Sequence, residues 1–264
     1  MMRIVPQAAL LWIALGTMSS TISAQGQSTS TVQMTAKDAA LFDMTGYWVS
    51  IVDEDWRWRM MTPPKGDYAS IPLNEDGRKV ADAWELAKDE AQGNQCRAFG
   101  AAGIMRQPTR LHIAWADANT LRIDTDAGMQ ERLFHFDTVK AKIGTPTWQG
   151  ESVADWEKQQ QSKSRAIPSF GGPVPGKGGT LHVITTHMRP GYYRGNGVPY
   201  SGNAVLIEFF DRVELNSDSY LIVTTVVQDP QYLREQFITS EQFKREPDGA
   251  KWHPTRCETE KPTR

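Results

Sequence analysis

Glu208 and His187 are the residues of this sequence best suited to act as a general acid and base. Glu208 lies within the apolar run 205–210 (VLIEFF), where an ionised carboxylate is costly unless it is paired. It therefore faces a polar cavity, meets an arginine or lies on the solvent face, and the first arrangement would suit a general base. His187 ends one apolar run and opens the loop that carries Arg189, where binding groups often lie. A hydrogen-bonded histidine at a strand end is the other interpretation.

A second group of residues could bind a ligand. Indole and guanidinium groups alternate along residues 56–59 (WRWR), and successive side chains of a strand point to opposite faces. Inward tryptophans would give a stacking surface for an apolar or aromatic ligand. Inward arginines could clamp a carboxylate or sulfate, and plain core filling by Trp with solvated Arg is the third interpretation. The predicted ligand-binding residues are Trp48, Trp56, Trp58, Arg57, Arg59, Arg189 and Tyr200.

Metal, nucleotide and nucleic-acid chemistry have little support. His182 and His187 are five positions apart, which places them on opposite faces of one strand, so a zinc site would need ligands from different strands. No metal ligand and no cofactor are therefore predicted. The sequence has no G-x-S-x-G elbow, phosphate-binding loop or dinucleotide fingerprint in a suitable context. A formal net charge of -2 gives no basic surface for nucleic acid.

The elements that must position these residues are mostly strands. Period-two alternation of apolar and polar residues predicts strands within 47–60, 111–115, 120–125, 132–136, 180–187, 204–211, 220–228 and 237–244. Helical spacing is convincing only over 77–91, with Asn74 as a candidate N-cap, and a second short helix is expected over 152–161. So many antiparallel strands with little helix predict a closed or nearly closed barrel, or a sandwich, with one or two short helices.

The N-terminus predicts export. Arg3, an apolar stretch over 4–16 and the small residues up to Ala24 form a secretory signal over residues 1–24. We expect a periplasmic or secreted protein after cleavage near Ala24, with no stable membrane span. A flexible lead-in over 25–40, a single β-barrel domain over 41–257 and a disordered tail over 258–264 would follow.

Cys96 and Cys257 are the two cysteines of the chain. In an oxidising compartment two such thiols are expected to pair, and a bond between them would tie the C-terminal end to an early loop. A catalytic cysteine is the alternative.

Two resemblances to known proteins add to these expectations. Gly46-Tyr47-Trp48 resembles the G-x-W that begins the first strand of lipocalin-type barrels, where Trp closes the barrel floor. This resemblance implies a calycin-type barrel. A longer pattern is similar to a family of exported bacterial proteins of unknown function, with W-x-G-x-S, W-E, G-D-T-L-x-V, H-S, E-R-F and E-D-P stretches. The matching residues here are 147–152 (TWQGES), 156–157 (WE), 179–183 (GTLHV), 200–201 (YS), 208–210 (EFF) and 229–230 (DP).

The longer resemblance implies export and a β-rich fold but no activity. Tyr200 stands where the relatives usually carry His, and residues are inserted between Glu157 and Gly178. Our first hypothesis is an exported barrel that holds a small apolar or aromatic ligand in its interior, with His187, Arg189, Tyr200 and Glu208 as polar groups. The alternatives are a periplasmic lyase, isomerase or hydrolase using a Glu/His acid-base pair, with or without a metal, and a structural envelope protein without a ligand.

Overall fold

The computed structural model describes residues 34–137, 144–158 and 179–258. Its strands are β1 (Gly46–Ile51), β2 (Arg110–Asp117), β3 (Thr120–Thr125), β4 (Ala127–Gly128), β5 (Glu131–His135), β6 (Glu151–Lys158), β7 (Gly179–Thr186), β8 (Gly191–Arg194), β9 (Val198–Tyr200), β10 (Val205–Leu215), β11 (Asp218–Gln228), β12 (Phe237–Glu246) and β13 (Thr255–Arg256). Its helices are α1 (Trp56–Arg59), α2 (Glu75–Asp82), α3 (Leu86–Ala91), the 3-10 helix η1 (Gln95–Phe99) and α4 (Ala101–Ile104). The predicted signal peptide, its cleavage site at Ala24 and residues 25–33 and 259–264 lie outside the described residues.

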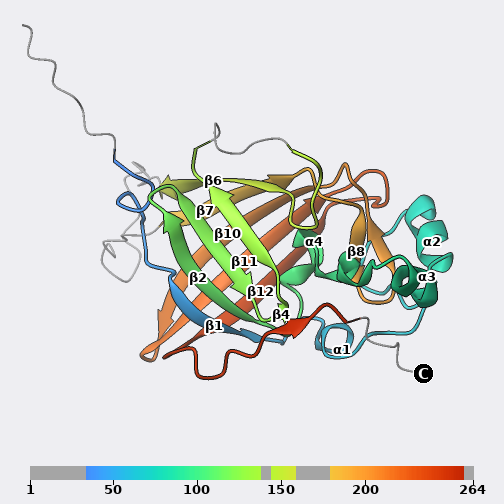
Figure 1. Cartoon of the computed structure of the whole chain (residues 1–264), viewed down its shortest axis with the longest axis horizontal. Helices are drawn as coiled ribbons and strands as arrows, with labels where there is room; N and C mark the ends of the chain where they lie inside the picture. The colour runs from blue at the N-terminus through green and yellow to red at the C-terminus, as the bar shows by residue number, and fades with distance from the viewer. Residues whose placement is uncertain (1–33, 138–143, 159–178, 259–264) are drawn as a thin grey trace, which may run out of the picture. The chain divides into compact units, whose positions relative to one another are not determined.

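Strands of the described residues close into a barrel in the order β1-β12-β11-β10-β7-β6-β5-β3-β2 (Figure 1). The predicted β-rich closed barrel is therefore confirmed, and its strand pairing is mixed rather than antiparallel throughout. β5 and β6 pair in parallel, with Phe134 opposite Ser152 and His135 opposite Val153. The described part of the segment expected as a second helix, residues 152–158, belongs to strand β6 instead, because Ser152 and Ala154 alternate with more exposed neighbours and face the core. Residues 159–161 of that segment lie outside the described residues.

The barrel interior is filled by the inward side chains of its strands. In β10, Leu206, Glu208 and Phe210 are fully buried while the residues between them are not, as the alternation predicts. An apolar cluster in the barrel includes Trp48, Leu111, Phe134, Phe210 and Phe243, each without exposed surface. Within the part of the chain that the structure describes, no helix is both long and apolar enough to cross a membrane.

The segment 56–104 and the hairpin 191–200, together called the cap, lie at one end of the barrel (Figure 1). α4 joins the two parts, because Ile104 belongs to the barrel cluster while Ala101 and Ala102 belong to a second cluster that continues into the cap. The predicted helix 77–91 forms as two helices, α2 and α3. Asn74 caps α2 as expected, since its side-chain oxygen accepts a hydrogen bond from the Gly77 N–H at 2.9 Å.

Trp84 lies between α2 and α3 and turns inward. Its indole packs directly against Gly197, whose φ of +81° belongs to the left-handed region. A β-carbon at this position would overlap the indole, so glycine is required both for the backbone conformation and for the close contact.

Residues 47–60 do not form one continuous strand. β1 ends at Ile51, and Asp55 adopts a left-handed conformation with φ 52°, which aspartate tolerates better than most residues. The chain then makes a single helical turn, α1, so the indoles and guanidiniums of residues 56–59 do not separate onto two faces.

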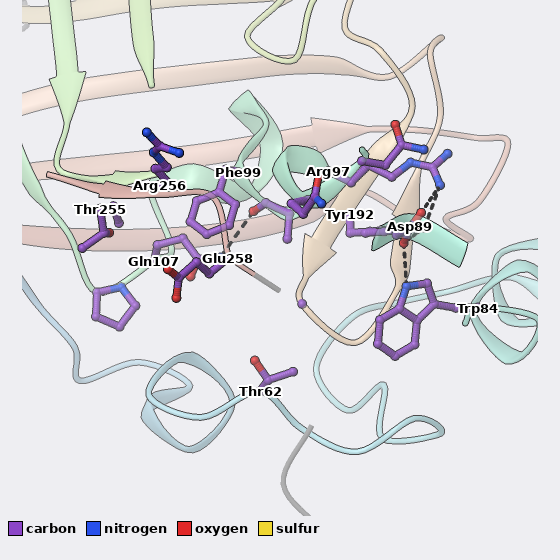
Figure 2. A pocket seen from close by; sticks show the side chains of 16 residues that line it. Thr62, Trp84, Asp89, Arg97, Phe99, Gln107, Tyr192, Thr255, Arg256 and Glu258 are labelled. Atoms are coloured by element: carbon purple, nitrogen blue, oxygen red, sulfur yellow. Dashed lines mark hydrogen bonds and ion pairs between the residues drawn. The ribbon is translucent and has the colours of Figure 1, made fainter. Parts of the chain in front are cut away.

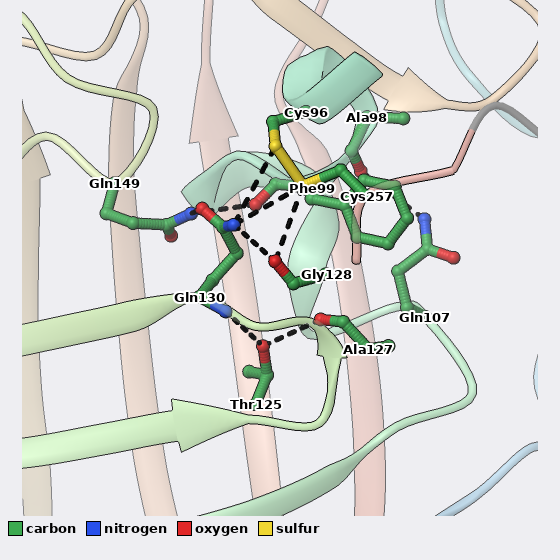
Figure 3. Close-up of a disulfide and its surroundings, with 10 residues drawn as sticks. All are labelled: Cys96, Ala98, Phe99, Gln107, Thr125, Ala127, Gly128, Gln130, Gln149 and Cys257. Carbon is green, nitrogen blue, oxygen red and sulfur yellow. Dashed lines mark hydrogen bonds between the residues drawn. A yellow bond between two sulfur atoms is a disulfide. The ribbon is translucent and has the colours of Figure 1, made fainter. Parts of the chain in front are cut away.

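The disulfide between Cys96 and Cys257 is present (Figure 3). It joins η1 to the segment that follows β13, and β13 pairs in parallel with β4. Gln130 lies beside the bond, with its Nε2 donating to the Gly128 carbonyl at 2.6 Å. The C-terminal segment is thus fixed against the cap and one barrel hairpin.

Candidate functional site

A pocket of about 320 Å³, here called the rim pocket, lies between the cap and the C-terminal segment (Figure 2). The aromatic rings of Trp84, Phe99 and Tyr192 contribute to its wall. Polar and charged groups from several elements complete it. They are Asp89 of α3, Arg97 of η1, Gln107, and Thr255 and Arg256 of β13. An aromatic wall with a few fixed polar groups is typical of small-molecule sites.

The Asp89 carboxylate fixes the aromatic wall of the rim pocket. It is almost fully buried and accepts hydrogen bonds from Trp84 Nε1 at 2.9 Å, Tyr192 Oη at 2.8 Å and Arg97 Nη1 at 2.7 Å. Arg97 Nη1 also lies 2.9 Å from Tyr192 Oη, and its guanidinium lies over the Tyr192 ring at 5.1 Å. The wall is therefore positioned before any ligand arrives, because its side chains hold one another.

The electrostatics of this network keep its groups in single protonation states. Burial lowers the pKa of Arg97, but the hydrogen bond and negative charge of Asp89 outweigh it and leave that pKa raised. Burial and the hydrogen bond to Asp89 raise the pKa of Tyr192. At neutral pH the pocket thus presents a guanidinium cation and a neutral phenol.

A second cavity of about 30 Å³, here called the arginine cavity, adjoins the rim pocket. Thr62, Gln107 and Gly195 line both. Arg59 of α1, Arg106 after α4 and Arg194 of β8 also line the smaller cavity, together with Trp58 and Tyr193. Its three arginines are all buried.

Two predicted site residues belong to the barrel interior. Trp48 is fully buried, donates from Nε1 to the Met44 carbonyl at 2.9 Å and lies under the Arg245 guanidinium. Glu208 is fully buried and accepts two hydrogen bonds from Arg132, at 2.8 and 2.5 Å. Of the arrangements considered for Glu208, the arginine pair is thus the one that forms.

The predicted residues of α1 have different environments. Trp56 is 61% exposed, and Arg57 is exposed beside the Trp58 ring. The interpretation of Trp56 and Trp58 as inward side chains on one face of a strand is therefore wrong. Trp58 and Arg59 do meet at one site, because both line the arginine cavity.

His187, Arg189 and Tyr200 lie elsewhere. His187 Nδ1 is 2.8 Å from the Thr186 hydroxyl, and the exposed Arg189 stacks on the Trp148 ring at 4.0 Å. Tyr200 is fully buried, and its hydroxyl has no hydrogen-bond partner among the described residues. Among the hydrogen bonds of the described chain, none joins two members of the set His187, Arg189, Tyr200 and Glu208. The predicted acid-base pair therefore gains no geometric support.

One group of potential metal ligands lies on the outside of the barrel. Asp155 and Glu157 of β6 and His182 of β7 have ligand atoms within 4.8 Å of one another. His182 Nδ1 lies 3.0 Å from Asp155 Oδ1, and its ring stacks on Phe209 at 5.0 Å. These three residues come from two different strands, as the sequence analysis expected of any metal site. The side chains of Asp155 and Glu157 are largely exposed, and exposed acidic groups of this kind are common in proteins without a bound ion.

Most of the residues at these two cavities were not predicted from the sequence. Asp89, Arg97 and Arg106 come from α3, η1 and the segment after α4, whereas Tyr192 and Arg194 both lie on β8. No local motif links these four segments. The usable signals were an arginine directly after the apolar stretch 101–105 (AAGIM) and another within the aromatic stretch 192–194 (YYR), since arginines in apolar surroundings need partners.

No family model matches the chain, and neither a curated protein nor a solved structure matches it significantly. The functional conclusion therefore depends on the geometry of the two cavities.

Proposed function

We propose that this is an exported β-barrel protein that binds a small apolar or aromatic molecule, and that the molecule lies in the rim pocket. The observation that carries the proposal is a cavity of about 320 Å³ lined by Trp84, Phe99 and Tyr192. Its volume lies near the lower end of the roughly 300–1,000 Å³ found for small-molecule sites. Asp89 already holds two of these rings, Trp84 and Tyr192, in place, so little ordering is needed when the ligand binds.

The rim pocket replaces the barrel interior as the proposed location of the ligand. Interior side chains such as Trp48, Leu111 and Phe134 have no exposed surface and pack in one cluster. Because protein cores are close-packed, a guest inside this cluster would have to displace side chains. The rim pocket needs no such rearrangement.

Export to the periplasm or the exterior is part of the proposal. The signal predicted over residues 1–24 would deliver the chain to a compartment where a disulfide such as Cys96–Cys257 persists. The buried Trp48 on β1, the first barrel strand, supports the lipocalin-like resemblance of Gly46-Tyr47-Trp48 and a calycin-type classification. The pattern shared with exported bacterial proteins is consistent with the same proposal.

The neutral aromatic probe N-phenyl-1-naphthylamine tests the proposal. We expect saturable binding of one probe per protein, measured by its fluorescence. Thr255 is exposed and lines the rim pocket, so Thr255→Trp should fill the pocket and weaken probe binding about tenfold or more, roughly the effect of losing one aromatic contact. Val213→Trp is the matched control, because Val213 lies on β10 and is 41% exposed.

Two results would contradict the proposal. No saturable probe binding would leave a structural protein as the better hypothesis. Equal probe binding by both tryptophan variants would move the ligand out of the rim pocket and back to the barrel interior. Native mass spectrometry of protein purified from its own host should, in addition, detect a bound small molecule that Thr255→Trp no longer retains.

A further inference from the structure

The arginine cavity combines three buried cations in a small space. Arg59, Arg106 and Arg194 are 7%, 6% and 4% exposed, and they come from α1, the segment after α4 and β8. A buried charge is costly unless it is paired and hydrogen-bonded. The partners of each guanidinium therefore decide what the cavity can do.

Arg106 is fully paired. Its Nη1 donates to Glu241 at 2.9 Å and its Nη2 to Asp55 at 2.7 Å. Asp55 also lies 3.7 Å from Arg194. These two carboxylates are the acidic groups in ion-pair contact with the three arginines among the described residues, so the cluster has one positive charge in excess.

Arg59 and Arg194 have unused donors. Arg59 donates to the main-chain carbonyls of Arg106 and Glu54, and Arg194 donates to the Ser70 hydroxyl. Arg59 Nη2 and the Nε and Nη1 atoms of Arg194 are buried without a hydrogen-bond partner in the described chain. Both side chains line the same cavity. Buried charged donors are normally satisfied, so an acceptor placed between Arg59 and Arg194 would stabilise the cluster.

Other acidic groups act on the arginines from beyond ion-pair distance. Asp67 is half-buried and uses its Oδ2 to accept from Trp58 Nε1 at 3.0 Å. Asp53 and Glu54 are exposed, so solvent screens their effect on Arg59. Burial and the neighbouring Arg106 charge lower the pKa of Arg194 to about 10, which still leaves it a cation at neutral pH.

We propose that the arginine cavity binds a compact monovalent anion, a carboxylate group or a halide, through the free donors of Arg59 and Arg194. The cavity of about 30 Å³ exceeds the roughly 10–15 Å³ that one water needs, and it is far smaller than a site for a whole aromatic ligand. An anion would satisfy the unused donors and neutralise the excess charge at once, whereas water would only satisfy the donors. The fork of guanidinium donors favours a carboxylate bound by two hydrogen bonds.

The anion could be a free ion or the carboxylate of a molecule in the rim pocket, since the two cavities share Thr62, Gln107 and Gly195. The anion site itself does not depend on the proposed function; only its occupation by such a ligand does. Formate and benzoate separate the two sources, because they carry the same carboxylate and only benzoate has a ring for the rim pocket.

The test is calorimetric titration of the full chain with sodium formate, in a zwitterionic buffer without other carboxylate or halide salts. We expect saturable binding of one formate per protein. Arg59→Met should weaken it about tenfold, as expected for loss of a charged hydrogen-bond donor. Arg57→Met is the matched control, because Arg57 lies in the same helix but is exposed and does not line the cavity.

Circular dichroism must show that each variant is folded, and Arg59→Lys replaces Arg59→Met if the latter is not. Lysine keeps the charge but loses the fork, so it should also weaken formate binding. Bromide soaked into crystals should give an anomalous peak between Arg59 and Arg194. Absence of saturable formate binding, equal effects of the Arg57 and Arg59 variants, or a bromide peak only elsewhere would each overturn the proposal.

Benzoate then identifies the source. If the anion belongs to a rim-pocket ligand, benzoate should bind more tightly than formate, and Thr255→Trp should remove that gain while formate binding stays unchanged. If benzoate gains nothing over formate, the site takes a free anion and the two cavities work separately. Formate binding tests the anion site alone, and binding of the neutral probe tests the rim pocket alone. Either proposal can therefore be contradicted without the other.

Discussion

The barrel interior and the cap both contain buried arginines, and the two regions compensate them differently. In the barrel, Arg132 meets Glu208 one to one, and both side chains are completely buried. In the cap, Arg59 and Arg194 share the arginine cavity with Arg106, which directly follows the cap segment. Among the described residues, the carboxylates within ion-pair distance of this group are Asp55 and Glu241.

The barrel pair is closed off from any ligand. Arg132 also lies 3.4 Å from the Thr185 hydroxyl, which is 2.7 Å from that of Ser152. The four residues thus link β5, β6, β7 and β10 from the inside. Arg132 keeps one unpartnered donor, Nε, beside the Phe134 ring in the apolar cluster. In the cap the unpartnered donors belong to Arg59 and Arg194, two side chains that line the same cavity. A buried arginine that is paired with a carboxylate links strands to one another. A buried arginine without such a partner, beside a cavity, can instead pair with a ligand.

Removing one member of the barrel pair should have the largest effect. Glu208→Ala leaves the Arg132 charge buried and unpaired, so we expect the free energy of unfolding to fall by about 3–5 kcal/mol. The double variant Arg132→Met/Glu208→Leu removes both charges and should recover most of this loss. Urea denaturation followed by tryptophan fluorescence measures both. If Glu208→Ala lowers the free energy of unfolding by only about 0.5 kcal/mol, the effect of a surface substitution, the pair does not stabilise the barrel as described here.

The double variant also sharpens the contrast between the regions. If the barrel pair is structural, Arg132→Met/Glu208→Leu should bind N-phenyl-1-naphthylamine as the unchanged protein does. A folded double variant that has lost the probe would instead place Glu208 in the binding site.

Breaking the disulfide should act on both regions. Cys96 and Cys257 are 161 positions apart, and a bond that closes so long a loop contributes about 2–5 kcal/mol by restricting the unfolded chain. We expect Cys96→Ala/Cys257→Ala to lower the free energy of unfolding by that amount. It should also weaken probe binding, because β13 lines the rim pocket. Unchanged probe affinity in the folded variant would show that the bond stabilises the chain without shaping the pocket.

The sequence predicted the barrel better than the cap, and the reason is the range of the interactions. Strand alternation is a local signal, so the strand β10 could be predicted from residues 204–211 alone. The side on which Glu208 lies could not, because apolar residues occupy both faces of 205–210 (VLIEFF). The same signal failed over residues 56–59, because four alternating residues fit one helical turn as well as a strand. In the structure, Asp55 adopts a left-handed conformation directly before residue 56, and the helical turn α1 begins there.

The arginine cavity could not have been predicted from the sequence. Arg59, Arg106 and Arg194 are far apart in the chain, and only the packing of α1, α4 and β8 brings them to one cavity. The clamp considered for Arg57 and Arg59 included one residue of this cavity, Arg59. It missed the partners, since those are tertiary neighbours.

The Asp89 network should have an intermediate effect. Asp89→Ala leaves Trp84, Arg97 and Tyr192 without their shared acceptor, so we expect a loss of about 2–3 kcal/mol in the free energy of unfolding. Asp76→Ala is the matched control, because Asp76 forms an exposed pair with Lys79 in α2, and such pairs contribute about 0–1 kcal/mol. Equal losses in the two variants would mean that the buried network does not hold the pocket wall.

Tyr68 should give the smallest effect, one that depends on pH. Its hydroxyl donates to Asp82 at 2.8 Å, and burial together with this hydrogen bond raises the pKa of Tyr68 from 10.0 to about 12. The folded state therefore favours the neutral phenol. This contribution is complete below pH 10 and is lost as the pH rises from about 10 towards 12, because the unfolded chain ionises first. At pH 8, Tyr68→Phe should lower the free energy of unfolding by about 1 kcal/mol.

Urea denaturation at pH 8 and at pH 11 separates this effect from general alkaline destabilisation. The difference between Tyr68→Phe and the unchanged protein should shrink at pH 11, since the unchanged protein then loses the same contribution. Tyr220→Phe, on the barrel strand β11 with a 3.5 Å contact to Asp218, serves as the comparison from the other region. A difference for Tyr68→Phe that stays constant between the two pH values would mean that burial of the ring, and not the bond to Asp82, holds this part of the cap.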